Sequence, residues 1–115
     1  MEILKKRYEF LKVAASRRKA VEPGLVLQVG RKTEGQAAAE LRVGFTASRK
    51  VGNAVERNRA KRRLRALAKN IMALEAEPGR DYVLVARRAI LSRSYPLLEQ
   101  DLRRALKTTA VERPA

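Results

Sequence analysis

The residues of this sequence that are best suited to chemistry are basic and lie close together. Residues 48–66 read SRKVGNAVERNRAKRRLRA, and eight of the seventeen residues from Arg49 to Arg65 are Lys or Arg, with Glu56 as the single acid. Guanidinium and ammonium groups bind phosphates, but a run of like charge repels itself and stays disordered unless something holds it. The segment therefore predicts a polyanion-binding site that depends on a folded scaffold.

Groups that carry out catalysis are scarce in the chain. It contains no Cys and no His, which excludes disulfides and thiolate metal sites and removes the commonest general base. The acids show no D-x-D motif or paired-carboxylate spacing, so neither a two-metal nuclease nor a glycosidase pair is indicated. The basic cluster has a single Gly and no Gly-Lys-Ser/Thr, unlike a phosphate-binding loop. The chain is poorly equipped to catalyse a reaction by itself.

Length and composition indicate a nucleic-acid partner. The 115 residues predict one domain, 1–115, with a single modest core. The net charge of +15, from 27 Lys and Arg against 12 Asp and Glu, favours binding to a polyanion. A membrane surface is the weaker alternative, because no apolar run approaches the roughly 20 residues of a spanning helix. No secretory pattern opens the chain, so we expect a cytoplasmic protein. We also expect no membrane partner and no small-molecule substrate.

Hydrophobic patterning predicts three elements before the basic cluster. Residues 3–15 have apolar residues at helical spacing, which predicts an amphipathic helix with a basic outer face. Residues 25–29 have the composition of a strand, and 30–39 read as a loop. Residues 41–48 alternate between apolar and polar side chains, which predicts a strand with one face in the core.

The basic cluster is predicted to form the first half of a long helix. Asn53 followed by Glu56 fits an N-cap with a capping-box acid, so the helix begins at about Ala54 and continues until Pro78-Gly79. Its apolar stripe covers only the later turns and consists of Leu64, Leu67, Ile71 and Leu74. We expect the first turns to project past the core, while packing of the later turns offsets the repulsion among the arginines.

The remaining segments complete an α+β pattern. Residues 81–86 are apolar at nearly every position and predict a strand covered on both faces. Ser94 and Pro96 open a last helix, and residues 108–115 are expected to be a frayed tail. The predicted order is therefore α-β-β-α-β-α, a single-layer sheet with helices packed against it.

Several side chains have both a structural and a functional interpretation. Phe10 at helical spacing is more often a core residue than a platform for base stacking, and Tyr8 is expected to face solvent instead. Thr46 and Ser48 are equally well explained as ordinary surface residues of a strand. The arginine cluster is harder to explain as a merely solvated face, because it is concentrated on a short capped segment of a strongly basic chain.

Longer phrases in the sequence match a family signature. Within the cluster the matching phrases are Arg49 to Val55, Arg57-Asn58-Arg59 and Lys61-Arg62. Elsewhere they are Leu4 to Arg7, Glu9-Phe10, Arg42-Val43-Gly44, Asp81-Tyr82-Val83 and Ala86-Arg87. This pattern closely resembles the bacterial ribonuclease P protein subunit over nearly the whole chain.

The resemblance implies a fold and an activity. The implied fold is a two-layer α/β sandwich with a mixed sheet, in which the long helix joins two parallel strands by a left-handed crossover. General physical rules favour the right-handed form. The implied activity is that of ribonuclease P: the protein binds the catalytic ribonuclease P RNA and precursor tRNA, while the RNA and its Mg²⁺ ions hydrolyse the 5′ leader from the tRNA.

The resemblance also implies two sets of binding residues. Those expected to contact the catalytic RNA are Arg49, Lys50, Asn53, Arg57, Asn58, Arg59, Lys61, Arg62 and Arg65. Those expected in a cleft for the single-stranded leader are Phe10, Ala14, Gln28, Thr46 and Ser48. Ala14 stands where many family members have a second aromatic residue, and Gln28 where a strand aromatic is common, which shifts the expected contacts toward Phe10 and polar groups.

Two other functions remain open on the sequence alone. A structural RNA-binding protein, such as a ribosome component, would share the charge, the fold class and the projecting helix, but it would not need a substrate cleft. A sequence-reading DNA-binding protein would require a recognition helix in a helix-turn-helix, whereas a strand precedes the basic helix here.

Overall fold

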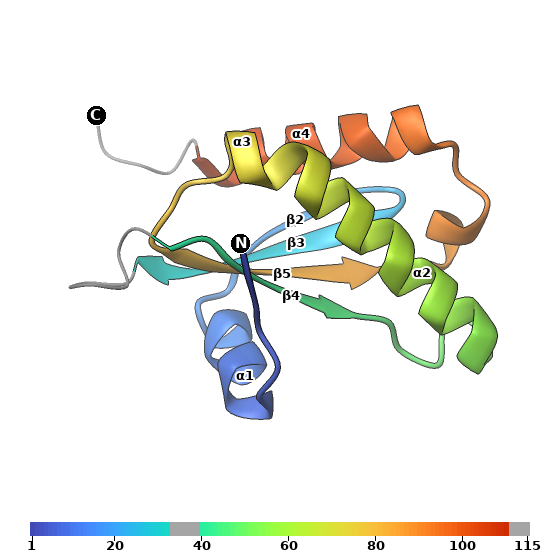
Figure 1. Ribbon diagram of the computed structural model, residues 1–115, viewed down its shortest axis with the longest axis horizontal. Helices are drawn as coiled ribbons and strands as arrows, with labels where there is room; N and C mark the ends of the chain where they lie inside the picture. Colours follow the sequence, from blue (N-terminus) through green and yellow to red (C-terminus); the bar gives the residue numbers. More distant parts are fainter. Residues whose placement is uncertain (33–39, 111–115) are drawn as a thin grey trace.

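The computed structural model describes residues 1–32 and 40–110 as an α+β fold (Figure 1). The strands are β1 (Glu2–Ile3), β2 (Arg18–Val21), β3 (Leu25–Lys32), β4 (Arg42–Thr46) and β5 (Arg80–Ala86). The helices are α1 (Arg7–Ala15), α2 (Ala54–Leu67), the π-helical turn η2 (Ala68–Met72), α3 (Ala73–Glu75), the 3-10 turn η3 (Arg88–Leu91) and α4 (Tyr95–Ala110). The predicted fold class is confirmed.

The five strands form one mixed sheet in the order β1-β4-β5-β3-β2. β4 pairs in parallel with both β1 and β5, whereas β3 pairs antiparallel with both β5 and β2. Antiparallel neighbours can be joined by a tight turn, as β2 and β3 are, but the parallel pair of β4 and β5 needs a crossover. Helix α2 is part of that crossover.

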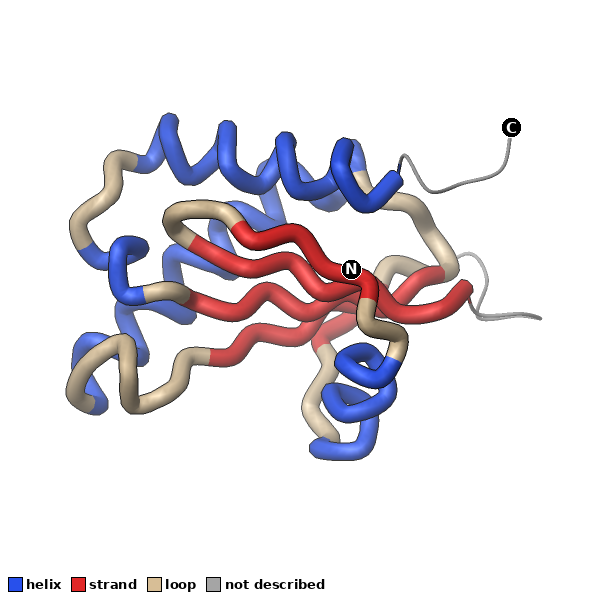
Figure 2. Tube along the Cα trace, turned by 180° about the vertical axis from the view of Figure 1, so that it is seen from behind, coloured by secondary structure: helices blue, strands red, loops and turns tan. Residues whose placement is uncertain are grey.

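The crossover through α2 is left-handed. When the strands of Figure 1 are turned to point upward, α2 lies on the viewer's side of the sheet and β5 lies to the left of β4. Figure 2 shows the same helix behind the strands when the molecule is seen from the back. The hand implied by the family resemblance is therefore correct, and the hand favoured by general rules for such connections is wrong for this protein.

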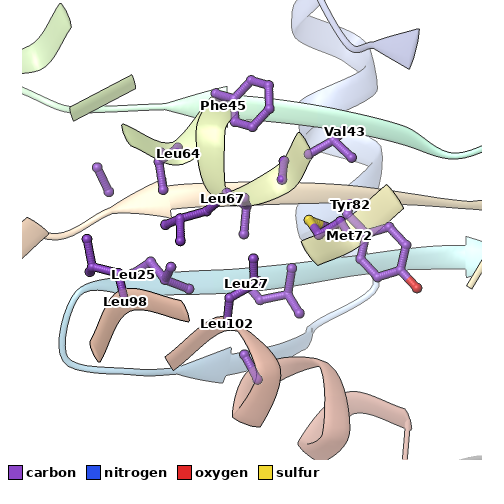
Figure 3. Close-up of a cluster of buried hydrophobic side chains, with 14 of the residues drawn as sticks. Leu25, Leu27, Val43, Phe45, Leu64, Leu67, Met72, Tyr82, Leu98 and Leu102 are labelled. Carbon is purple, nitrogen blue, oxygen red and sulfur yellow. The ribbon is translucent and has the colours of Figure 1, made fainter. Parts of the chain in front are cut away.

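The main core lies between the sheet and the pair α2 and α4. Figure 3 shows Phe45 and Val43 of β4 on the same side of the sheet as Leu64 and Leu67 of α2. The buried residues of this core also come from the inward positions of β3 and β5 and from α4; they include Leu25, Leu27, Tyr82, Leu84, Leu98 and Leu102. The alternation predicted for β4 is confirmed, because Val43 and Phe45 lie in this core.

Helix α1 lies on the opposite face of the sheet (Figures 1 and 2). It buries Val13 in a smaller cluster with Leu4 and Val83, against which Phe10 and Val85 pack. Because Val83 points to this cluster and Leu84 to the main core, β5 is buried on both faces as predicted.

The first helix and the first strands differ from the prediction. Helix α1 begins at Arg7 and not at Ile3 as predicted. Ile3 instead belongs to β1, where it pairs with Val43. Strand β2 was not predicted at all, since its four residues are too short for a clear alternation. Strand β3 continues to Lys32, so the predicted loop at 30–39 is wrong for its first residues. The rest of that loop lies outside the described residues.

At the end of the long helix, the buried residues differ from the predicted apolar stripe. Leu64, Leu67 and Ile71 are buried as predicted, but Leu74 is 86% exposed. The π-helical turn η2 contains more residues per turn than an α-helix, so it rotates the residues that follow it. Ala76, rather than Leu74, packs against the core.

The predicted frayed tail begins too early. Helix α4 continues to Ala110, and Thr109 is buried, with its hydroxyl donating a hydrogen bond to the carbonyl oxygen of Ala105 at 3.0 Å. The guanidinium of Arg18 on β2 also donates to the carbonyl oxygen of Thr109. The residues from 111 onward lie outside the described part.

A buried carboxylate attaches α4 to the β2–β3 turn. Asp101 is fully buried and accepts two hydrogen bonds from Arg93, at 2.7 and 2.9 Å, and one from Arg104 at 3.1 Å. The N–H of Gly24 in the turn donates to the same carboxylate at 3.2 Å. Arg104 also donates to Glu22 at 2.7 Å, and this hydrogen bond raises the pKa of Arg104 above its ordinary value.

We expect Asp101→Ala to lower the free energy of unfolding by about 3 to 5 kcal/mol, because it leaves the paired guanidinium groups without their buried partner. The control is Arg103→Ala, which removes an exposed ion pair to Glu75 and should cost about 0 to 1 kcal/mol. Urea unfolding of both variants measures the difference. Similar losses in the two variants would contradict a special role for Asp101.

Candidate RNA-binding surfaces

The first turn of α2 is fixed by a capping box. The side-chain oxygen of Asn53 accepts the N–H of Glu56 at 2.9 Å, and the Glu56 carboxylate accepts the N–H of Asn53 at 2.9 Å. Gly52 has φ +155°, and a Cβ atom there would lie 2.3 Å from the Glu56 carboxylate. The predicted cap is confirmed, and the glycine leaves the space that it needs.

Some cations of α2 are used to hold the helix on the protein. Arg63 donates to the carbonyl oxygen of Ile90 at 2.7 Å, and Arg59 donates to that of Leu91 at 3.1 Å. Arg57 donates to the carbonyl oxygen of Gly52 at 2.9 Å. These bonds tie α2 to η3 and to the turn that precedes the helix, which helps a helix with so many like charges to keep its position.

The opposite face of α2 is free for a ligand. A shallow hollow on this face, which we call the α2 surface, is lined by Val55, Asn58, Lys61, Arg62 and Arg65. Their spacing of three or four residues places them on one side of the helix. Within the described part of the chain, Asn58, Lys61 and Arg62 form no side-chain hydrogen bond or ion pair, and the guanidinium of Arg65 lies 5.9 Å from the centre of the Phe45 ring.

The projecting first turns were predicted correctly. None of residues 54–59 is buried, and Val55 is 73% exposed, whereas Ala60 and Leu64 are fully buried. Arg49 and Lys50 lie in the exposed turn between β4 and α2, where the N–H of Lys50 donates to the Ser48 hydroxyl at 3.3 Å. This turn adds two more exposed cations next to the beginning of α2.

The acids of the described residues are mostly engaged with arginines outside the basic cluster. Arg42 lies among Glu2, Glu9 and Asp81, and Arg80 pairs with Glu77. At the other end of the fold, the carboxylates of Asp101, Glu22 and Glu75 are paired with arginines around α4. Glu40 shares a hydrogen bond with Glu2, which raises the pKa of Glu40. The α2 surface therefore keeps its positive charge.

The sheet face beside α1 forms a second candidate surface. Strand pairing places Thr46, Val85, Val26 and Val21 in one row across β4, β5, β3 and β2. A neighbouring row contains Gly44, Val83, Gln28 and Lys19. Cross-strand partners point to the same side of a sheet. Val83 lies under α1, so both rows face α1. We call the accessible residues of the two rows the open sheet face. They are Lys19, Val21, Val26, Gln28, Thr46 and Val85.

Phe10 borders the open sheet face. It is half-buried, and a Cβ atom on Gly44 would lie 2.6 Å from its ring, so the glycine provides the space in which the ring lies. Phe10 packs against the cluster of Leu4, Val13 and Val83. Phe10 therefore has a packing role, and because its side chain is only partly buried, its predicted role in base stacking stays a prediction. Tyr8 is 62% exposed, as predicted.

A comparison with known proteins identifies the family. A protein-family model described as Ribonuclease P matches residues 1–110. The chain belongs to the ribonuclease P protein family. The ribonuclease P protein component of Paramagnetospirillum magneticum is 51% identical over 108 residues, which cover 93% of this chain and 81% of the relative. That of Ruegeria pomeroyi is 45% identical over 115 residues, which cover 99% and 90%.

Solved structures of family members share the fold. The RNase P protein of Staphylococcus aureus superimposes with a TM-score of 0.75 at 22% identity and covers 98% of this chain and 99% of its own. The RNase P protein of Thermotoga maritima gives a TM-score of 0.76 at 23% identity, with 94% and 97% covered. The mixed five-stranded sheet and its helices are therefore the fold of this family.

The predicted site residues of this family member lie in several different places. Asn58, Lys61, Arg62 and Arg65 come together on the α2 surface, whereas Arg57, Arg59 and Asn53 also hold the protein itself together. Gln28 and Thr46 share the open sheet face, and Ala14 is exposed one helical turn after Phe10. Ser48 lies beyond β4 in the exposed turn.

Sequence reasoning missed two features of these surfaces. Lys19 and Val21 were not considered, because β2 was not predicted. The anchoring of Arg63 to η3 was also missed; the only available signal was that Arg63 lies on the opposite side of the helix from the free cations.

No helix in residues 1–32 and 40–110 is long and apolar enough to span a membrane. Over the same ranges, no three His, Cys, Asp or Glu side chains are arranged to hold a metal ion.

Proposed function

We propose that this chain is the protein subunit of ribonuclease P, which binds the catalytic RNA and precursor tRNA during removal of the 5′ leader. The observation that carries the proposal is the α2 surface, whose cations have no counter-charge among the described residues and lie on a rigid, capped helix. Membership of the ribonuclease P protein family supports the reaction. A cytoplasmic location is part of our proposal.

The catalytic RNA binds the α2 surface and the turn before it. Arg62, Lys61 and Arg65 contact phosphates, and the Asn58 amide bonds a sugar hydroxyl or a base edge. Arg57 and Arg59 join them, because a guanidinium has five N–H donors and each uses one of its groups within the protein. Arg49 and Lys50 extend the contact toward β4.

The single-stranded leader binds between α1 and the open sheet face. Phe10 offers one accessible aromatic ring for stacking, and Thr46 and Gln28 offer polar groups on the same side of the sheet. Ser48 lies at the edge next to the catalytic-RNA surface. Ala14 adds no ring, so stacking depends on Phe10.

Hydrolysis is assigned to the RNA and its Mg²⁺ ions. Most carboxylates of the described residues are paired with arginines or used in a cap, and no three of them are arranged to hold a magnesium ion. No catalytic step is assigned to this chain. Its contribution is fixed positive charge, which lowers the repulsion between RNA strands that must approach each other.

A structural RNA-binding protein, for example a component of the ribosome, is the alternative. It would account for the α2 surface but not for a half-exposed Phe10 that lies over Gly44 beside an accessible sheet face. A DNA-reading function ranks last, because β4, and not a packed helix, precedes α2. The RNA that co-purifies with the tagged protein separates the first two functions: a structured catalytic RNA supports the proposal, and ribosomal RNA supports the alternative.

We expect Arg62→Ala to weaken binding to the catalytic RNA and to reduce the slope of log K against log salt by roughly 0.7 to 0.9, the contribution of one phosphate contact. Lys107→Ala is the control, because Lys107 is an exposed cation on α4 that forms no ion pair in the described chain. Filter binding over a range of salt concentrations gives both values. Unchanged affinity and slope for Arg62→Ala would exclude this residue from the RNA contact.

We expect cleavage of precursor tRNA to require the RNA and not the protein. The RNA alone should cleave at high Mg²⁺, and the protein should lower the Mg²⁺ concentration needed, because it supplies fixed positive charge. Cleavage assays with each component and with the reconstituted complex test this division. Cleavage by the protein alone at the rate of the complex would refute it.

We expect Phe10→Ala to weaken the binding of precursor tRNA to the holoenzyme by about 1 to 3 kcal/mol, the usual loss for one stacked base, with mature tRNA unaffected. The control is Leu11→Ala, which truncates an exposed apolar residue on the same helix. Melting curves of both variants show whether folding has changed. A folded Phe10→Ala variant with the wild-type preference for precursor tRNA would remove Phe10 from the leader site.

A further inference from the structure

Lys19 lies on the open sheet face, on the edge strand β2, which is the strand farthest from β4 on that side of β5. It pairs directly with Gln28 across β2 and β3, so the two side chains are neighbours on the α1 side of the sheet. Three strand spacings of about 4.8 Å each separate β2 from β4, where Thr46 lies. A chain that enters the open sheet face beside Thr46 and crosses it therefore arrives at Val21 and at Lys19, which is two residues away on the same face of β2.

The surface between these two ends is mostly apolar, with Gln28 as a neutral polar side chain beside Lys19. Val85 and Val26 are half-buried, and Val21, next to Lys19 on β2, is 56% exposed. An apolar floor suits the faces of bases and riboses but offers nothing to phosphates. Among the described residues of the open sheet face, Lys19 is the cation that can contact the phosphate backbone of a bound strand.

The charge of Lys19 is not neutralised within the described chain. Lys19 is exposed and forms no ion pair or hydrogen bond through its side chain there. The two nearest acids along the sequence are engaged elsewhere: Glu9 pairs with Arg42, and Glu22 pairs with Arg104. A phosphate is the natural partner for such an ammonium group.

Arg17 strengthens the positive charge at this place. It directly precedes β2, and it has φ +59°, the left-handed conformation that glycine commonly adopts after a helix. An exposed arginine therefore occupies a position where glycine would fit with less strain. Together, Arg17 and Lys19 form a basic edge beside β2.

We propose that Lys19, assisted by Arg17, binds phosphate groups of the 5′ leader at nucleotides farther from the cleavage site than those beside Phe10 and Thr46. The inference rests on the proposed function, because it extends the path of the same leader. It also accounts for the absence of aromatic residues at Ala14 and Gln28: ionic contacts to the backbone take the place of stacking in this part of the surface.

A purely structural explanation of Lys19 is also available, because charged residues on an edge strand prevent association between sheets. The two roles differ in what they predict. An edge-protecting lysine affects self-association, whereas a phosphate-binding lysine affects only those substrates whose leader is long enough to reach β2.

The test measures the affinity of the reconstituted holoenzyme for precursor tRNAs with leaders of increasing length. We expect the wild type to gain affinity as the leader lengthens past Phe10, and Lys19→Ala to lose about three- to tenfold of that gain while binding short-leader substrates as before. The salt slope for long leaders should fall by about 0.7, the value for one phosphate of a single strand. Lys19→Arg should restore both quantities, and Lys19→Gln should behave like Lys19→Ala.

The matched control is Lys12→Ala. On α1, Lys12 lies about 200° around the helix from Phe10, on the side of Glu9 and Arg42, so its loss should not change the dependence on leader length. Arg17→Gly should also reduce the affinity gained from a long leader, as Lys19→Ala does. It should not lower the melting temperature, because glycine accepts the left-handed conformation.

The outcomes separate the inference from the proposed function. If the wild-type holoenzyme binds precursor and mature tRNA equally, the proposed leader site is wrong. If the wild type prefers long leaders and folded Lys19→Ala keeps the full gain and the full salt slope, the leader site stands and the role of Lys19 is overturned. A loss that Lys12→Ala shows equally would also overturn it, because the effect would then come from net charge alone.

Discussion

The structure depends on the burial of the second half of the long helix. Leu64, Leu67 and Ile71 are fully buried against β4, β5 and α4, and they hold a helix whose first half would otherwise unfold under its own charge. Isolated helices of this length are marginal in water, and repulsion among the cations lowers their stability further. One end of the helix is therefore stabilised by burial of apolar side chains, and the other end presents positive charge to solvent.

The arginines of this protein are divided between two tasks. Arg63 and Arg59 donate to backbone carbonyl groups of η3, and Arg93 and Arg104 surround the buried carboxylate of Asp101. These guanidinium groups use their forked donors within the fold. Most acids of the described residues are also engaged there, so the α2 surface keeps cations that have no acidic partner within residues 1–32 and 40–110.

The sequence predicted elements whose signals are local. The cap at Asn53, the alternation in β4 and the burial of β5 follow from neighbouring residues, and the structure confirms them. β2 was missed because its four residues carry little periodicity and it is held by pairing with β3, which is a tertiary contact. Leu74 was misplaced because the π-helical turn changes the phase of the helix. The left-handed crossover could come only from the family resemblance, since general rules favour the other hand. The roles of the site residues in binding stay predictions.

Strand β4 connects the two candidate surfaces through its alternation. Phe45 points into the main core, and its ring lies 5.9 Å from the Arg65 guanidinium of the α2 surface, while Thr46 points to the open sheet face. Gly44, on the same side as Thr46, leaves the space that the Phe10 ring occupies. A shift of the strand by one residue would exchange these faces, placing Phe45 under α1 and Thr46 in the core. Pairing with β5 on one side and β1 on the other prevents that shift. The register of one five-residue strand therefore fixes where the arginine helix and the aromatic ring of α1 lie relative to each other.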